Sequence, residues 1–123
     1  MTVRQRILIV DDDTAHLQST KGILEAEGYE VFTHDQPFGS TAAIMQYRPH
    51  LVLLDVNMPG LSGEKLADVY RGNSRIRETR VMLYSSNDED ALRDASRRLQ
   101  LDGYVCKGNP ATLRLRVASV LAR

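Results

Sequence analysis

Residues 7–13 read ILIVDDD, a run of four aliphatic residues that stops abruptly at three aspartates. The aliphatic run shows no alternation of apolar and polar positions, which is typical of a strand buried on both faces of a parallel sheet. The same form returns at residues 51–54, which read LVLL, and at residues 81–84, which read VMLY. Each of these runs is followed by polar residues. The runs therefore predict strands of one parallel sheet whose two faces are both covered.

Two weaker candidates, residues 29–33 and 103–107, bring the predicted strands to five at fairly even intervals. Segments of helical length separate them, so strand and helix alternate along the chain. Such alternation requires a parallel sheet with helices on both faces, because each right-handed crossover places its helix on one side or the other. A closed eight-stranded barrel would need about twice as much chain. The predicted fold class is α/β, a five-stranded parallel sheet flanked by five helices.

Terminal signals and apolar periodicity mark the helices. The first helix, residues 14–27, is closed by Gly28, and the last opens with Asn109 as its N-cap and Pro110 at its first helical position. For the helices between them we expect the apolar stripes to face the sheet. These stripes are Phe38, Ala42 and Met45, then Leu66, Val69 and Tyr70, and finally Leu92, Ala95 and Leu99.

The composition excludes several classes of protein. A length of 123 residues fits one domain, and sixteen basic residues balance sixteen acidic ones, so the positive field of a dedicated nucleic-acid binder is missing. The only cysteine, Cys106, cannot form an intrachain disulfide, which favours a reducing compartment. The apolar runs are too short to cross a bilayer, and the first residues lack a signal-peptide core. We expect one cytoplasmic domain over residues 1–123, without nucleic acid or membrane as a direct partner.

Polar side chains stand where the predicted strands end. Residues 11–13 are aspartates that follow the first strand, Asp55 follows the third, Ser85 the fourth, and Lys107 ends the fifth. Ligands of an open parallel sheet bind outside the carboxyl ends of its strands, so we expect these groups to meet at one edge. Clustered carboxylates repel one another unless a cation offsets their charge. Mg²⁺ takes oxygen ligands and keeps waters and phosphoryl oxygens, so the sequence predicts a magnesium site there.

Taken singly, several of these residues have a plainer explanation. Asp13 directly precedes a helix and is better explained as its N-cap. Ser85 alone would be a turn residue. His16, His34 and His50 lie on separate elements without ligand spacing, which argues against zinc, and we expect them to be ordinary surface residues. The functional interpretation depends on acid, hydroxyl and ammonium groups ending several strands at the same edge.

Four segments together resemble the receiver domain of bacterial two-component response regulators, in the single-domain chemotaxis style. They are ILIVDDD at 7–13, LLDVNMPG at 53–60, LYSS at 83–86 and GYVCK at 103–107, in the order and spacing of that family. The resemblance covers nearly the whole chain and implies the flavodoxin-like strand order 2-1-3-4-5. It also implies a phosphoacceptor module that takes a phosphoryl group from a histidine kinase or phosphotransfer protein and signals to a downstream protein.

The resemblance implies a role for each matching acidic residue. Asp55 would be the phosphoacceptor. Asp11, Asp12 and Asp55 would hold Mg²⁺, with the backbone carbonyl of Asn57 as a further ligand. The chain would catalyse its own phosphorylation and dephosphorylation without being an enzyme for external substrates.

The same resemblance assigns the remaining site residues. Ser85 and Lys107 would contact the phosphoryl oxygens, and Tyr104 would change rotamer on activation. Lysine and magnesium neutralise charge on an already ionised acceptor, so the transfer needs no general base. The new dianion would draw the Ser85 hydroxyl inward and free space for Tyr104 to turn in, which converts a local charge into a surface change.

The chain departs from the family pattern after the lysine, which is usually followed by proline. Here Lys107 is followed by Gly108 and Asn109. A cis bond without proline costs about 2.5 to 4 kcal/mol, so we predict a trans bond between Lys107 and Gly108. Gly108 can adopt backbone angles closed to other residues, which would let the lysine still point at Asp55.

Other functions have their own sequence marks. A pseudo-receiver, which binds partners without phosphorylation, usually lacks an acidic or lysine position, and none is lost here. A phosphohydrolase would place a general acid two residues after the nucleophile, where this chain has Asn57. A nucleotide-binding domain would want a glycine-rich loop in place of the aspartates of residues 11–13. The loop at 71–80, with its four arginines, is interpreted as a solvated connection, with a partner-docking patch as the alternative.

Overall fold

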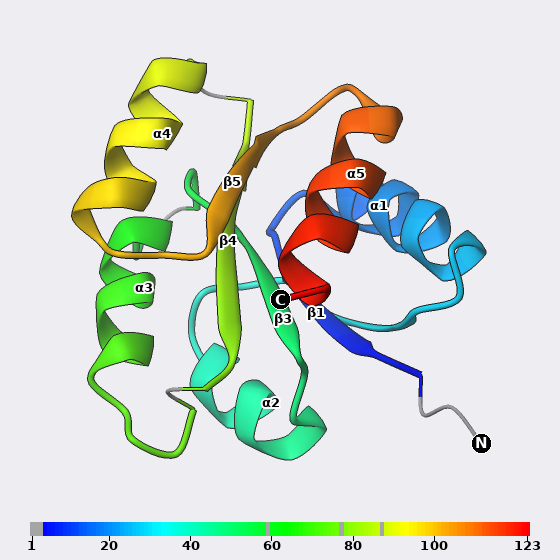
Figure 1. The fold of residues 1–123 in the computed structure, drawn as a ribbon. Helices are drawn as coiled ribbons and strands as arrows, with labels where there is room; N and C mark the ends of the chain where they lie inside the picture. The colour runs from blue at the N-terminus through cyan, green and yellow to red at the C-terminus, as the bar shows by residue number, and fades with distance from the viewer. Residues whose placement is uncertain (1–3, 59, 77, 87) are drawn as a thin grey trace.

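A computed structural model describes residues 4–58, 60–76, 78–86 and 88–123 of the chain, in which strand and helix alternate (Figure 1). The strands are β1 (Arg6–Val10), β2 (Glu30–His34), β3 (Leu51–Asp55), β4 (Arg80–Ser85) and β5 (Gly103–Cys106). The helices are α1 (Thr14–Ala26), α2 (Ser40–Tyr47), α3 (Gly63–Arg71), α4 (Glu89–Arg98) and α5 (Pro110–Leu121). None of the described helices has the length and apolar character that a membrane span requires.

The strands form one parallel sheet in the order β2-β1-β3-β4-β5, which confirms the predicted fold class. The chain passes from β1 to β2 on one side and returns to β3 on the other, so the order reverses between β1 and β3. At that point Val10 lies beside Leu54, and one residue further Asp55 lies beside Tyr84 of β4. The carboxyl ends of β1 and β3 therefore flank the crevice where parallel sheets bind their ligands.

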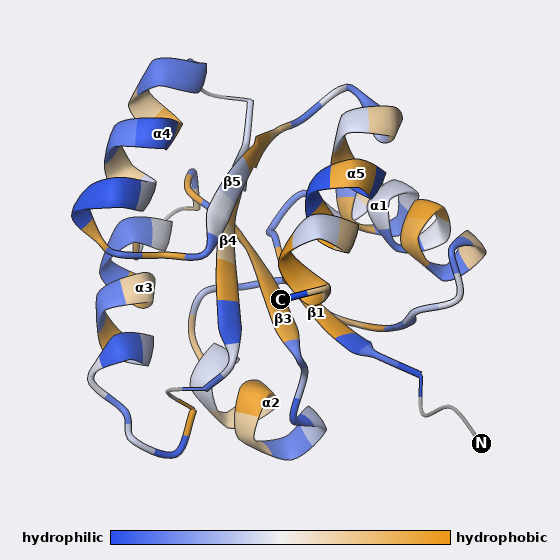
Figure 2. Ribbon diagram, in the orientation of Figure 1, coloured by the Kyte–Doolittle hydropathy of each residue, from blue (hydrophilic) through white to orange (hydrophobic). Residues whose placement is uncertain are grey.

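Helices α1 and α5 cover one face of the sheet, and α2, α3 and α4 cover the other (Figure 1). Alternate strand residues divide between the two layers: Ile7 and Ile9 pack with α1 and α5, whereas Leu8 and Val10 pack in the opposite layer. Figure 2 shows the strands as apolar bands between helices whose outer faces are largely polar. Burial on both faces accounts for the unalternated apolar runs.

Local capping fixes where the helices begin. The Asp13 side chain accepts a hydrogen bond from the backbone of His16, and that of Asn109 accepts one from Thr112, which confirms both predicted N-caps. Gly28 follows α1 with a φ of +96°, in the left-handed region that favours glycine.

The apolar stripe predicted for the second helix is wrong. Phe38 is 61 % exposed and precedes α2, which begins at Ser40, and Met45 within the helix is 37 % exposed. The helical spacing from that start buries Ser40, Ala43 and Ile44 instead. Ala42 is exposed as well.

The later stripes are nearer the structure. In α3, Leu66 and Tyr70 are buried as predicted, but Val69 is 51 % exposed because it lies beside the buried face rather than on it. In α4, Leu92 and Ala95 are buried, and Leu99 packs against them from the C-cap position.

The loop between α3 and β4 is more than a solvated connection. Ile76 is buried in the core, and the guanidinium of Arg71, the last residue of α3, lies 3.2 Å from the Asp102 carboxylate. Arg77, which belongs to the four-arginine pattern of this loop, lies outside the described residues.

Candidate functional site

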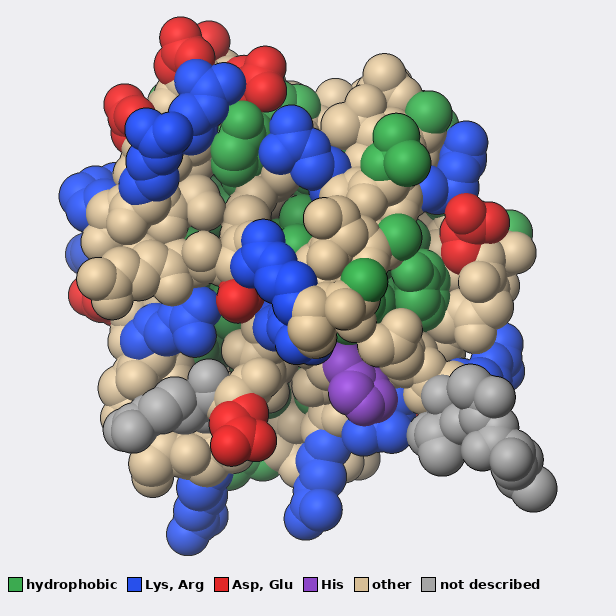
Figure 3. Space-filling view, viewed as in Figure 1, with side chains coloured by type: hydrophobic (Ala, Val, Ile, Leu, Met, Phe, Trp, Pro, Cys, Tyr) green, Lys and Arg blue, Asp and Glu red, His purple; other side chains and the backbone are tan. Residues whose placement is uncertain are grey.

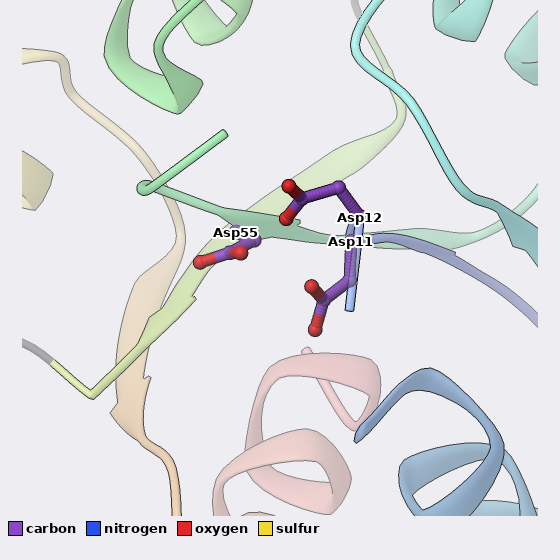
Figure 4. Close-up of side chains that lie close together, drawn as sticks. All are labelled: Asp11, Asp12 and Asp55. Carbon is purple, nitrogen blue, oxygen red and sulfur yellow. The ribbon is translucent and has the colours of Figure 1, made fainter. Parts of the chain in front are cut away.

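Three acidic side chains converge from the ends of β1 and β3 (Figure 4). One carboxylate oxygen from each of Asp11, Asp12 and Asp55 lies within 4.8 Å of the others. Asp11 has no exposed surface and Asp55 is 3 % exposed, whereas Asp12 faces solvent. The cluster therefore has a buried floor and an open side.

The loops that follow these strands orient the two buried carboxylates. Asp11 accepts a hydrogen bond of 3.0 Å from the backbone N–H of Asp13, and Asp55 accepts one of 3.2 Å from that of Asn57. Each carboxylate thus binds the backbone two residues further along its own loop, which limits the rotamers available to it.

Lys107 reaches both buried carboxylates from the end of β5. Its Nζ donates a 2.9 Å hydrogen bond to Asp11 Oδ2 and lies 3.6 Å from Asp55 Oδ2. Burial alone would lower the pKa of Lys107, but the hydrogen bond to Asp11 and the charges of Asp55 and Asp11 outweigh it and raise the pKa. The lysine is therefore a fixed ammonium group at neutral pH.

The pKa of Asp55 moves upward, from its ordinary 3.8 to about 6. Burial is the main cause, and the negative charge of Asp11 adds to it, while the Asn57 N–H and the Lys107 ammonium oppose the shift. At neutral pH most of the Asp55 population is still ionised. The site thus holds a carboxylate whose negative charge is only partly compensated by the groups around it.

The backbone after Lys107 follows the prediction made for it. The Lys107–Gly108 bond is trans, and Gly108 has a φ of +105°, which side chains other than glycine rarely allow. The lysine still points at the acidic cluster, and Asn109 then caps α5.

Ser85 lies at the end of β4 with no exposed surface, and its hydroxyl accepts a 3.0 Å hydrogen bond from the side-chain amide of Asn57. The sequence placed only the backbone carbonyl of Asn57 in the site, so this side-chain contact is an additional finding. It joins the loop after β3 to the end of β4.

Tyr104 on β5 points away from the acidic cluster toward α4 and α5. Its hydroxyl donates to Glu89 Oε1 and accepts from Arg93 Nε, both at 3.2 Å. The Arg116 guanidinium stands over its ring, 4.9 Å from the centroid. Figure 3 shows the surroundings of this contact, where acidic and basic side chains lie together over α4; its first turn is acidic and its last turn basic.

The predicted histidines do not gather, but they are not simple surface residues either. His16 stacks on Tyr84 with ring centroids 5.7 Å apart, and His34 Nε2 lies 2.7 Å from the carbonyl oxygen of Phe38. His50 Nδ1 accepts a 2.9 Å hydrogen bond from a backbone N–H. Burial and then the nearby charges of Arg6 and Arg80 lower the pKa of His50.

Two residues near the site escaped sequence reasoning. Gly63 opens α3, and a Cβ there would stand 2.8 Å from the Cα of Val56, so the loop after β3 packs on a position that only glycine can fill. Tyr84 is 3 % exposed and lies under Lys107, whose Nζ is 5.1 Å from the ring centroid. A signal for Tyr84 was present, since it is the one hydroxyl-bearing residue in the apolar run at 81–84.

Comparisons with known proteins agree on one family. The family model described as the response regulator receiver domain matches residues 7–118. The aerobic respiration control protein ArcA of Escherichia coli K12 is 30 % identical over 118 residues, which are 95 % of this chain and 48 % of ArcA. The DNA-binding response regulator MtrA of Mycobacterium tuberculosis is 36 % identical over 87 residues, 71 % of this chain and 37 % of MtrA. The chain therefore spans less than half the length of these relatives.

Solved structures show the same fold. A CheY-like response regulator receiver domain protein from Methanospirillum hungatei is 31 % identical, with a TM-score of 0.86 over 98 % of this chain and 95 % of that one. The chemotaxis protein CheY4 of Vibrio cholerae, 24 % identical, superposes with a TM-score of 0.87 over 96 % of this chain and 99 % of its own. With the sheet order, the acidic cluster and the family match in agreement, this chain belongs to the response regulator receiver domain family.

Proposed function

We propose that this receiver domain accepts a phosphoryl group on Asp55 and that the modified form presents a changed surface to a downstream protein. The observation that carries the proposal is the position of Lys107, whose ammonium joins the two buried carboxylates Asp11 and Asp55 at the reversal of strand order. A buried carboxylate beside a fixed cation is a nucleophile whose attack on a phosphoryl group meets less repulsion.

The donor set at this edge suits a hard divalent cation. Asp11, Asp12 and Asp55 offer carboxylate oxygens close together, and such oxygens are the ligands that Mg²⁺ prefers. We assign these carboxylates and the backbone carbonyl of Asn57 as the groups that would hold it. When bound, the ion would neutralise negative charge on the acceptor and on the phosphoryl group.

The phosphoryl donor would be the phosphohistidine of a histidine kinase or a phosphotransfer protein. An oxygen of Asp55 forms a bond to phosphorus while the nitrogen–phosphorus bond of the donor breaks, and the imidazole leaves with the electron pair of that bond. Lys107 would donate to a phosphoryl oxygen and so stabilise the charge of the transfer. Later attack of water on the same phosphorus would return Asp55 to a free carboxylate.

The structural change that follows phosphorylation would begin at Ser85. A phosphoryl group on Asp55 needs hydrogen-bond donors, and the Ser85 hydroxyl, whose oxygen accepts from the Asn57 amide, would turn its own O–H toward a phosphoryl oxygen. Tyr104 would then leave Glu89 and Arg93 and turn inward. The partner surface would therefore lie over α4, β5 and α5.

The test is the reaction of the protein with a small phosphodonor, acetyl phosphate, in the presence of Mg²⁺. We expect mass spectrometry to find one added phosphoryl group on the wild type and on the control Asp94→Asn, which changes an exposed carboxylate of α4. Asp55→Asn should gain none, because the amide is not a nucleophile of this kind. A chelator should abolish the wild-type reaction.

Two outcomes would contradict the proposal. Phosphorylation of Asp55→Asn at the wild-type rate would place the acceptor elsewhere. A wild type that stays unmodified with Mg²⁺ would favour a pseudo-receiver that recognises its partners without phosphorylation.

A further inference from the structure

The sheet order places Tyr84 in the path of the lysine. Asp55 on β3 and Tyr84 on β4 are partners in register, and Val105 of β5 is the next partner on the same face. Lys107 lies two residues beyond Val105, so its side chain leaves β5 on that face as well. Because β4 separates β3 from β5, the lysine must cross β4 to reach Asp55, and it crosses at Tyr84.

We propose that Tyr84 is a positioning residue, whose ring is the platform that holds the Lys107 ammonium over the acidic cluster. The inference rests on the proposed function of Asp55. The ring is 3 % exposed, and the Lys107 Nζ stands 5.1 Å from its centroid. A cation at that distance from an aromatic face is attracted by the electrons of the ring, most strongly where water is excluded.

Contacts from α1 hold the ring itself in place. The Tyr84 hydroxyl shares a short hydrogen bond with the buried hydroxyl of Thr20 and lies 3.4 Å from His16 Nε2. The His16 ring stacks on the tyrosine with only 10° between the two planes. The tyrosine therefore cannot turn without losing partners at both its hydroxyl and its ring.

The loop after β5 gives the lysine little support of its own. The Lys107 N–H donates to the Ser85 carbonyl at 2.8 Å, but Gly108 follows at once, and a Cβ built there would meet nothing within 4 Å. Glycine has the widest choice of backbone angles of any residue. A platform beneath the side chain supplies a restraint that the backbone after Lys107 lacks.

The first experiment compares Tyr84→Leu and Tyr84→Phe in the acetyl phosphate reaction. We expect the leucine variant to react about 3- to 10-fold more slowly, because it loses the attraction between ring and cation, and the phenylalanine variant to recover most of the rate. The matched control is Tyr70→Leu, which removes another buried tyrosine, on α3, whose hydroxyl donates to the buried hydroxyl of Ser40. Thermal melting of each variant reports whether it folds.

A second series keeps the shape of the ring and therefore does not depend on the leucine variant folding. Phenylalanine analogues with one, two and three ring fluorines at position 84 withdraw electrons from the ring face in steps. We expect the rate to fall with each added fluorine. Equal rates throughout the series, or a phenylalanine variant as slow as leucine, would overturn the proposal.

Two further measurements separate this proposal from that for Asp55. In a Lys107→Ala background, Tyr84→Leu should cause no additional loss of rate, since its effect passes through the lysine; a full additional loss would overturn the inference. Amide hydrogen exchange at residues 107–109 needs no phosphorylation and should speed up in Tyr84→Leu but not in Tyr70→Leu. Unchanged exchange in Tyr84→Leu would overturn the proposal that the Tyr84 ring positions Lys107, even if Asp55 is phosphorylated. Faster exchange would support that proposal even if Asp55 is not phosphorylated.

Discussion

Asp55 is a carboxyl group whose surroundings favour its protonated form. Burial raises its pKa from 3.8 to about 6, and the charge of Asp11 opposes ionisation further. In the unfolded chain the group has its ordinary pKa, so the native state binds the proton more tightly. This preference stabilises the fold fully below about pH 4 and is lost as the pH rises through 6.

The same residue therefore predicts a pH-dependent stability difference. Without metal, Asp55→Asn should be more stable than the wild type at pH 7 by about 2 kcal/mol, because the amide carries no charge to bury. At pH 4 the two proteins should differ much less. Urea unfolding with a chelator present measures both values, and a difference that is equal at the two pH values would contradict the upward shift.

At the scale of elements, the start of α3 fixes the loop that carries Asn57. Gly63 approaches the backbone of Val56 so closely that a methyl group must push the loop or the helix aside. Gly22, in the exposed part of α1, would meet nothing within 4 Å. The two glycines thus form a natural pair for comparison.

We expect Gly63→Ala to destabilise the protein by about 2 kcal/mol and to slow phosphorylation, because the displaced loop no longer holds its hydrogen bonds to Asp55 and Ser85. Gly22→Ala should stabilise it by about 0.5 to 1 kcal/mol, since alanine is the better helix former. Denaturant unfolding and the acetyl phosphate reaction test both. A Gly63→Ala variant as stable as Gly22→Ala would show that the contact is easily relieved.

At the scale of the whole molecule, the proposed output is a change on one face. Adding beryllofluoride with Mg²⁺, as a mimic of the phosphoryl group, should alter amide exchange in α4, β5 and the start of α5, where Tyr104 now binds Glu89 and Arg93. We expect little change in α2, which packs against β1 and β2 rather than against β5. A change confined to the loop at 71–80 would favour the partner-docking interpretation of its arginines.

The overall architecture follows from the sequence because a parallel sheet with alternating helices allows few arrangements of its strands. Unalternated apolar runs identify its strands, and the topology then brings the groups at their carboxyl ends together. The sequence is therefore enough to predict that Asp11, Asp55 and Lys107 share one site. Side-chain contacts away from the strand ends could not be predicted. Tyr84 meets Thr20 across 64 positions, and no local pattern signals that pairing. The predicted stripe of α2 is wrong because Phe38 precedes the helix and the buried face is formed by Ser40, Ala43 and Ile44.

Adjacent residues of β4 extend to opposite layers of the molecule. Tyr84 packs toward α1 and α5, and Ser85 points the other way, toward the loop after β3. In the proposed function, the rate of Asp55 phosphorylation would depend on Tyr84, and the change of the partner surface would depend on Ser85. Substitutions at the two positions would therefore alter the two properties separately. A variant altered only at Ser85 would accept the phosphoryl group without changing its partner surface. Such a variant is what an engineered signalling circuit needs as a decoy that takes phosphoryl groups from a kinase without passing on the signal.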